Sequence, residues 1–321
     1  RVVVDNPDIN GRLKILEVHA KGKPLAEDVD LHTLARRTPG FTGADLANLM
    51  NEAALKAARE NKTQIFMVDF EASIDRVVAG PERKSRVISE KEKKIVAYHE
   101  VGHAIVLEKL GPEGADPVHK VTILPRGLAL GYTMQLPQDD RYLISRSQMK
   151  ANIAGFLGGR AAEEIIFSEI TTGAHNDLER ASDVARRMVT EFGMSDRLGP
   201  ITLGRRHGNP FLGRDLMEDR NYGEDVAKAI DEEVKAIIQE SYGRAQEILT
   251  ENHEAMERVV SVLLERETLE REDFLALLAG EALPPRPEPA APPSDQPKKQ
   301  TETSPLPGTQ VLKPQPKGSP A

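Results

Sequence analysis

Apolar residues recur at intervals of three and four along most of the chain, and this spacing predicts a mainly α-helical fold. The clearest case is the stretch 223–249, where Val226, Ile230, Val234 and Ile237 fall on one helix face. The acidic and basic residues between them are typical of solvated faces. The same spacing predicts further helices over 146–166, 177–192, 252–266 and 270–279.

The first 80 residues predict a bundle of short helices after a strand-like run at 2–4. Helices are expected at about 7–19 and 26–37, and a third opens at the T-x-x-D cap of Thr42 and Asp45. Asp69 is placed as the cap of a fourth helix. We therefore expect a helical domain over 1–80 and a polar linker over 81–85.

Residues 86–280 form a second predicted domain, in which helices accompany a small β element. The segments 119–125 and 130–137 are predicted strands. The remainder, 281–321, holds 12 of the chain's 22 prolines. A segment of this composition cannot bury a core, so a disordered tail is expected.

Composition narrows the classes of function and of site. The 321 residues are enough for two domains. The net charge of −8 is not that of a basic, nucleic-acid-binding protein. The chain has no cysteine, so a metal site must use histidine and carboxylate ligands. No apolar run of about 18 residues occurs. Because the chain opens on Arg1 and enters a strand-like run at once, we expect a fragment of a longer protein.

The stretch 98–103 contains the pattern H-E-x-x-H, formed by His99, Glu100 and His103. Two histidines four residues apart lie on one helix face and can chelate one zinc ion, with the glutamate beside them as a general base. Ser89 and Glu92 form a capping box before this segment, so the histidines should fall in mid-helix.

A third protein ligand is expected, because catalytic zinc sites use three side chains and leave a fourth position open. The metzincin continuation is excluded, since Val106 and Lys109 stand where its glycine and last histidine belong. Downstream carboxylates remain as candidates, and spacing alone does not choose among Glu163, Glu164 and Asp177. The predicted strands beside the site can accept an extended peptide by strand addition, although a plain structural hairpin is the simpler interpretation.

Several motifs together resemble the FtsH family of membrane-anchored, ATP-dependent zinc proteases. The resemblance covers about residues 1–280. Its motifs, in the family's order, are V-V-V-D-N-P-D at 2–8, T-P-G-F-T-G-A-D-L at 38–46, A-Y-H-E-V-G-H at 97–103, L-G-G-R-A-A-E-E at 157–164 and T-T-G-A-H-N-D at 171–177. Val101 replaces the alanine common in the family's H-E-A-G-H, a conservative departure.

The resemblance implies a mainly α fold, with an AAA+ lid bundle followed by a mostly helical zinc-protease domain. It implies His99, His103 and Asp177 as zinc ligands and Glu100 as the catalytic base. Glu163 and Glu164 then become supporting or structural residues.

The resemblance also implies that the first domain closes over a nucleotide, ATP or ADP, with His19, Gly43 and Ala44 near the adenosine. The family's phosphate-binding loop does not occur in this sequence, and we expect that loop and the membrane helices upstream of Arg1. The expected assembly is a homohexamer on the cytoplasmic face of the bacterial inner membrane. Its expected substrates are unfolded or membrane proteins.

Two functions follow from these features. The first is an ATP-dependent zinc endopeptidase, in which activated water attacks a peptide bond. The second is a non-catalytic ring-assembly module whose metal is structural. Glu100 favours the first, because a purely structural site has no use for a base.

Overall fold

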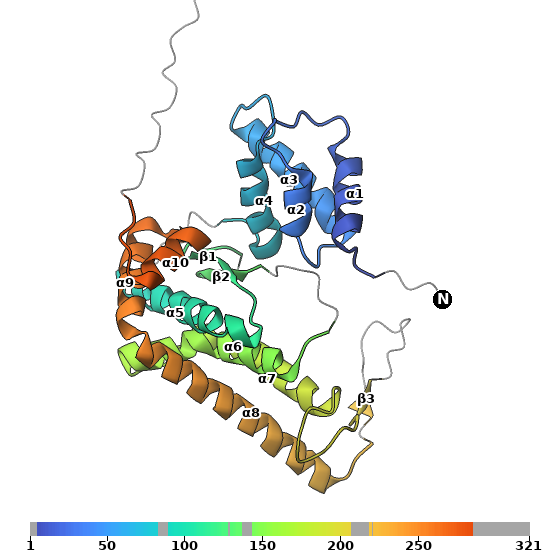
Figure 1. Ribbon diagram of the computed structural model, residues 1–321, viewed down its shortest axis with the longest axis vertical. Helices are drawn as coiled ribbons and strands as arrows, with labels where there is room; N and C mark the ends of the chain where they lie inside the picture. The colour runs from blue at the N-terminus through green and yellow to red at the C-terminus, as the bar shows by residue number, and fades with distance from the viewer. Residues whose placement is uncertain are drawn as a thin grey trace, which may run out of the picture. The chain divides into compact units, whose positions relative to one another are not determined.

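The computed structural model describes residues 5–82, 89–127, 129–136, 143–206, 218–219 and 221–284. All of them except Pro284 belong to one unit of the chain, Arg1–Leu283. The strand-like run expected at 2–4 lies outside the described residues. So do most of the linker predicted at 81–85 and nearly all of the tail predicted to be disordered. Helices α1 to α10 dominate the described chain, which confirms the predicted mainly α-helical fold (Figure 1).

Four helices form an N-terminal bundle, α1 to α4 (Figure 1). Their bounds are Ile9–Ala20, Leu31–Arg36, Gly43–Arg59 and Met67–Ala79. The T-x-x-D cap predicted before α3 is present as a capping box. The Thr42 side chain accepts the Asp45 N–H, and the Asp45 carboxylate accepts the Thr42 N–H. The bundle is held by a buried apolar cluster that includes Leu16, Leu34, Leu46, Leu49, Met50 and Phe70.

Two boundaries in this bundle differ from the prediction. The helix expected over 26–37 is shorter, because the Asp30 carboxylate caps α2 by accepting from His32 N–H. Ala26 instead donates its N–H to the Ile65 carbonyl at 2.9 Å, outside any helix. Helix α4 begins before Asp69, which lies in its first turn and accepts the Phe66 N–H at 3.0 Å.

The following residues form the larger, mostly helical part. Its main helices are α5 (Glu90–Lys109), α6 (Arg146–Phe167), α7 (His175–Thr190), α8 (Glu224–Glu251), α9 (His253–Arg266) and α10 (Arg271–Ala279). Short 3-10 turns at Gly111–Glu113 and Thr172–Ala174 follow α5 and precede α7. Ser89 and Glu92 form the predicted capping box at the start of α5.

A small antiparallel sheet, of strand order β2-β1-β5, lies beside α5. Both predicted strands are present in shortened form, as β1 (Val118–Thr122) and β2 (Tyr132–Gln135). The third strand, β5 (Thr268–Glu270), was not predicted, because three residues between two helices carry no periodicity. The short pair β3 (Arg205–Arg206) and β4 (Glu218–Asp219) was also not predicted.

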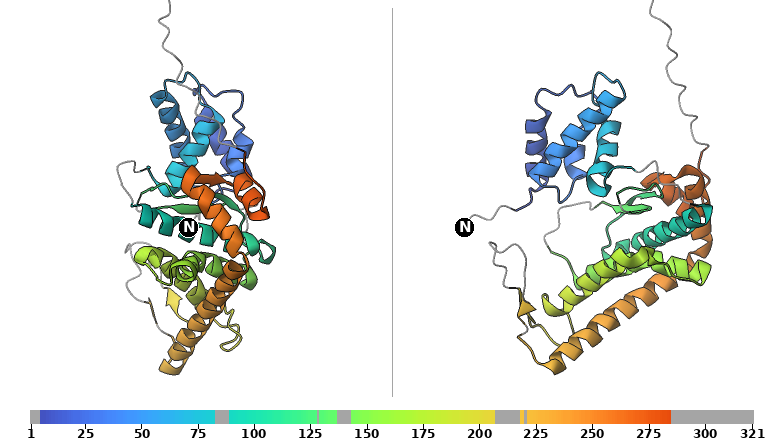
Figure 2. Two further views of the ribbon diagram at one scale, coloured as in Figure 1. Left: turned by 90° about the vertical axis from the view of Figure 1, so that its left-hand side faces the viewer. Right: turned by 180° about the vertical axis from the view of Figure 1, so that it is seen from behind.

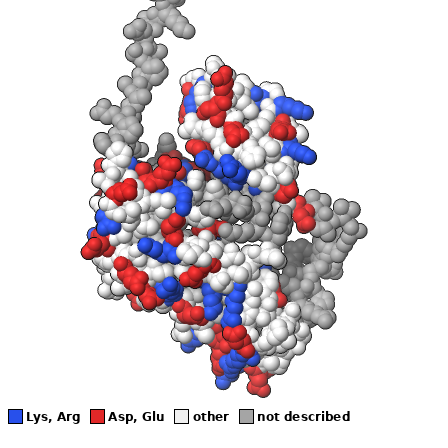
Figure 3. Space-filling view, in the orientation of Figure 1, with Lys and Arg blue, Asp and Glu red and all other residues white. Residues whose placement is uncertain are grey.

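Helices α5, α6 and α8 run as successive layers (Figure 2). One apolar cluster fills the space between α5, the sheet, α9 and α10, and a second joins α6, α7 and α8. Acidic and basic side chains are interspersed over the face drawn in Figure 3, as expected of solvated faces. Among the described residues, no helix is long and apolar enough to cross a membrane.

Helices α5 and α6 approach each other at glycine. A Cβ built on Gly102 would lie 2.5 Å from the Gly158 carbonyl oxygen, and one on Gly158 would lie 2.7 Å from that of Gly102. Real Cβ atoms do not tolerate such distances from backbone, which cannot move aside as a flexible side chain can. This crossing therefore requires both glycines.

We predict that Gly158→Ala destabilises the protein by about 1–3 kcal/mol or more, because the added methyl group forces the two helices apart. Urea unfolding measures the change. Gly243→Ala in α8 is the control, since a Cβ there meets nothing within 4 Å. That control should leave stability unchanged or raise it by about 0.5–1 kcal/mol. Equal stability of Gly158→Ala and wild type would contradict the close-packed crossing.

Candidate metal centre

Helix α5 presents His99 and His103 together. Their ring centroids are 4.6 Å apart with the planes at 85°, and the two Nε2 atoms are 3.0 Å apart. His103 is buried, and the side chain of His99 is 12% exposed. The four-residue spacing thus brings two imidazole nitrogens to one point, as predicted from the sequence.

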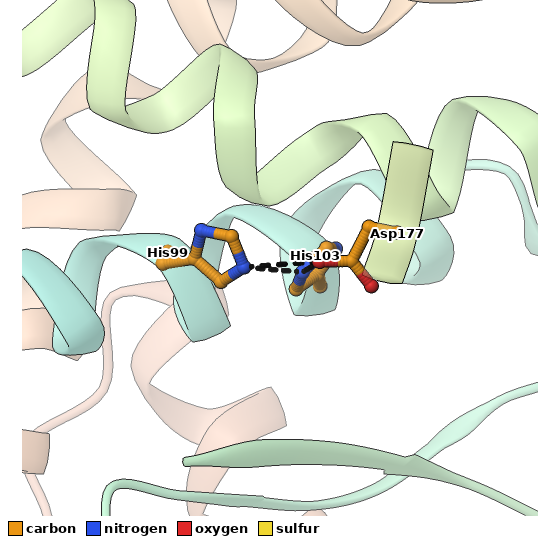
Figure 4. Close-up of side chains that lie close together, drawn as sticks. All are labelled: His99, His103 and Asp177. Atoms are coloured by element: carbon orange, nitrogen blue, oxygen red, sulfur yellow. Dashed lines mark hydrogen bonds and ion pairs between the residues drawn. The ribbon is translucent and has the colours of Figure 1, made fainter. Parts of the chain in front are cut away.

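Asp177, in the first turn of α7, reaches the same point from another helix (Figure 4). Its Oδ2 atom lies 3.3 Å from His99 Nε2 and 3.5 Å from His103 Nε2. Within the described part of the chain, these three side chains form the one group of His, Cys, Asp or Glu residues able to hold a metal ion. One ligand atom from each lies within 4.8 Å of the others.

Hydrogen bonds on the far side of each ring orient the imidazoles. His103 Nδ1 lies 2.8 Å from the Gly155 carbonyl oxygen, which can only accept, and 3.3 Å from the Gly159 backbone nitrogen. The shorter contact favours a proton on Nδ1. His99 Nδ1 lies 2.7 Å from Glu163 Oε1, where an ionised carboxylate accepts in the same way. A proton on Nδ1 leaves the Nε2 lone pair free for a metal ion.

The two neighbouring glutamates, which the sequence left as alternative ligands, occupy different places. Glu163 is buried and also accepts the Thr171 N–H at 2.8 Å, in the segment that leads to Asp177. Glu164 is exposed and accepts from Tyr242 and Gln246 of α8. Of the three candidate carboxylates, only Asp177 faces the Nε2 atoms.

Gly159 keeps the space beside the imidazoles open, and sequence reasoning missed its importance. A Cβ on Gly159 would lie 2.6 Å from the Nε2 atoms of both His99 and His103. Any larger residue would therefore clash with the two imidazoles at the atoms that would bind a metal ion. The available signal was the Gly158-Gly159 pair in mid-helix, where glycine is otherwise unfavourable.

Glu100, between the two histidines in sequence, is 7% exposed on the side of α5 that faces β2. Thr133 Oγ1 donates to its carboxylate, with Oγ1 and Glu100 Oε2 2.9 Å apart. Sequence reasoning did not single out Thr133, since nothing local marks a threonine on a distant strand as a partner of this residue.

The predicted nucleotide contacts lie in the N-terminal bundle, apart from the histidine pair in sequence. His19 is in the last turn of α1, and Gly43 and Ala44 begin α3. Gly43 faces α1, because a Cβ there would lie 3.9 Å from Ile15 Cδ1, whereas Ala44 is exposed. Their role toward a nucleotide stays a prediction.

Comparison with known proteins agrees with this geometry. Residues 86–277 match the family described as "Peptidase family M41". Residues 28–72 match the family described as "AAA+ lid domain". The chain belongs to peptidase family M41. This confirms the family resemblance drawn from the motifs.

Relatives of the chain carry the name "ATP-dependent zinc metalloprotease FtsH". One from Pseudothermotoga lettingae is 58% identical over 282 residues, covering 88% of this chain and 45% of the relative. One from Thermotoga maritima is 53% identical over 282 residues, covering 88% and 46%. Another, "ATP-dependent zinc metalloprotease FtsH 3" from Symbiobacterium thermophilum, is 59% identical over 290 residues, covering 90% and 46%. The chain spans less than half the length of each.

The charge balance of this M41 centre fits a bound cation. Burial lowers the pKa of His99, but hydrogen bonds to Asp177 and Glu163 outweigh it and raise that pKa to about 10. Burial opposes ionisation of Asp177, yet the two imidazoles hold its pKa well below the usual range. The anionic groups thus hold a positive charge in the centre, as a proton or as a metal ion. Two imidazoles and a carboxylate without thiolate are a donor set that suits zinc.

We predict that Asp177→Ala weakens zinc binding by more than roughly 100-fold, because loss of a direct ligand should exceed the 10- to 100-fold effect of losing an outer partner. Metal analysis of the purified chain measures zinc per chain. Glu164→Ala is the matched control and should keep wild-type zinc content. If Asp177→Ala retains zinc and Glu163→Ala loses it, the third ligand is Glu163 and not Asp177.

We further predict that zinc uptake at about pH 8 releases a proton from His99 in addition to the one that bound water can give up, because His99 is protonated in the metal-free centre and must be neutral to bind the ion. Protonation of His99 by itself should lower the apparent affinity about tenfold for each pH unit below its pKa. Calorimetric titration in buffers of different ionisation enthalpy measures the number of protons released. Release of one proton or none per zinc ion, in place of about two, would refute this protonation state.

Proposed function

We propose that this chain is the lid and protease part of an ATP-dependent zinc endopeptidase. The observation that carries the proposal is the convergence of His99, His103 and Asp177 beside the buried Glu100. The names of the relatives support the same activity.

In this proposal His99 Nε2, His103 Nε2 and an Asp177 oxygen hold the zinc ion. Zinc bound there supplies Lewis-acid chemistry, lowering the pKa of water from about 15.7 to about 7 and polarising a peptide carbonyl. Glu163 and the Gly155 carbonyl keep both imidazoles oriented.

Glu100 is the general base and acid of the reaction. Burial raises the pKa of its carboxyl group, while His99, His103 and Thr133 act in the opposite direction. A carboxylate whose pKa is raised in this way can accept a proton from water and return it to the leaving amine. A non-catalytic assembly module with a structural metal gains nothing from this buried carboxylate, so it is not favoured.

The substrate is proposed to be an extended polypeptide. In the described sheet β2 has β1 on one side and no strand on the other, and the Thr133 side chain of this edge strand contacts Glu100. An extended segment can add to such an edge through backbone hydrogen bonds, largely independent of side chains. This suits an enzyme that acts on unfolded or membrane proteins of varied sequence.

The larger setting is also proposed from the family. The domains are 1–80, a linker at 81–85 and 86–280, with His19, Gly43 and Ala44 near a bound ATP or ADP. The intact protein is a homohexamer, attached to the cytoplasmic face of the bacterial inner membrane through a segment other than those described.

We predict that Glu100→Gln lowers kcat for a short fluorogenic peptide by at least roughly 100-fold, because the amide cannot accept the proton. A short peptide needs no unfolding and therefore no ATP. Zinc content should stay at the wild-type level, which separates loss of the base from loss of the metal. Unchanged kcat in Glu100→Gln, or zinc-loaded wild type that cleaves no peptide, would rule out the proposed endopeptidase.

A further inference from the structure

Thr133 lies in the middle of β2, paired with Val121 of β1. Its hydroxyl oxygen is 2.9 Å from Glu100 Oε2 and 2.9 Å from the Glu100 backbone carbonyl oxygen. Among the described residues, Thr133 is the one side chain that hydrogen-bonds to the Glu100 carboxylate. The hydroxyl has one hydrogen, which it donates to one of these two oxygens or shares between them. The same oxygen of Thr133 thus lies against both the main chain and the side chain of Glu100.

The residue just before β2, Gly131, also confines the aliphatic part of this glutamate side chain. A Cβ on Gly131 would lie 2.9 Å from Glu100 Cγ and 2.9 Å from Val96 Cγ1 of α5. The same Cβ would lie 2.7 Å from the Thr122 backbone oxygen of β1, so only glycine fits at this position. Gly131 and Thr133 together thus lie along the Glu100 side chain, the first near its Cγ atom and the second at its carboxylate.

A glutamate side chain has several rotatable bonds, and a base acts only when its carboxylate is held at the reacting atoms. Burial restricts the side chain of Glu100 but does not by itself select one carboxylate position. The Thr133 hydroxyl supplies that selection, since it fixes Oε2 relative to the α5 backbone.

We propose that Thr133 is a positioning residue that holds the Glu100 carboxylate in place for proton transfer. Because Thr133 belongs to the edge strand, the strand that receives the peptide also fixes the position of the base relative to it. This inference rests on the proposed endopeptidase function.

The test compares Thr133→Val, Thr133→Ser and wild type as the full zinc-loaded chain. Valine keeps the β-branched shape and strand preference but lacks the hydroxyl, whereas serine keeps the hydroxyl. We expect Thr133→Val to lower kcat for the fluorogenic peptide by roughly 10- to 100-fold, with KM nearly unchanged. Thr133→Ser should restore most of the loss, and zinc content should be the same in all three.

Thr122→Val is the matched control. Thr122 is a buried threonine of the same sheet, but its hydroxyl bonds to Thr268 and the Glu267 carbonyl instead of Glu100. This variant should lose stability without a change in kcat. An equal fall of kcat in Thr122→Val and Thr133→Val would show a general effect of weakening the sheet and overturn the proposal.

Crystal structures of zinc-free Thr133→Val and wild type give a readout that does not require activity. The proposal expects the Glu100 carboxylate to leave its wild-type position, or to occupy several, in Thr133→Val. An unmoved carboxylate would overturn the positioning role. If the carboxylate moves but wild type cleaves no peptide, the endopeptidase proposal fails while the positioning contact stands.

Discussion

The candidate centre depends on how closely α5 and α6 approach. Gly102 and Gly158 let the two backbones touch, and the contacts of α6 with the histidines follow from that distance. It brings the Gly155 carbonyl to His103 Nδ1 and places the bare Cα of Gly159 beside both imidazoles. A wider crossing would separate His103 Nδ1 from the Gly155 carbonyl oxygen. It would also move Gly159 away from the two imidazoles. The glycines of α6 destabilise the helix itself, but only they allow this close approach.

The carboxyl groups around His99 determine the charge that the centre can hold. Asp177 and Glu163 bring carboxylates to His99, and the buried Glu100 adds a third carboxyl group nearby. Such a collection of acceptors is unfavourable in a buried place unless positive charge is present. The apolar clusters hold the helices in position, whereas the polar groups determine that a cation belongs between them.

The features that could be predicted from the sequence are those fixed by local geometry. Helix periodicity, the caps at Thr42 and Ser89, and the pairing of His99 with His103 depend on residues a few positions apart. The choice of Asp177 over Glu163 and Glu164 required the family resemblance, because it depends on how separate helices meet. Thr133 and Gly159 were missed for the same reason, and β5 is a strand only because β1 lies beside it.

The two bonds of Glu163 have a wider consequence. One carboxylate accepts from His99 Nδ1 on α5 and from the Thr171 N–H, which precedes the helix of Asp177. Two candidate ligands that are 78 residues apart in sequence are therefore joined through one buried anion. Loosening of the α6–α7 connection would release the orientation of His99 and the position of Asp177 in the same event. The centre should accordingly assemble and come apart as a cooperative unit, with metal escape governed by local opening of that connection rather than by exchange of single ligands.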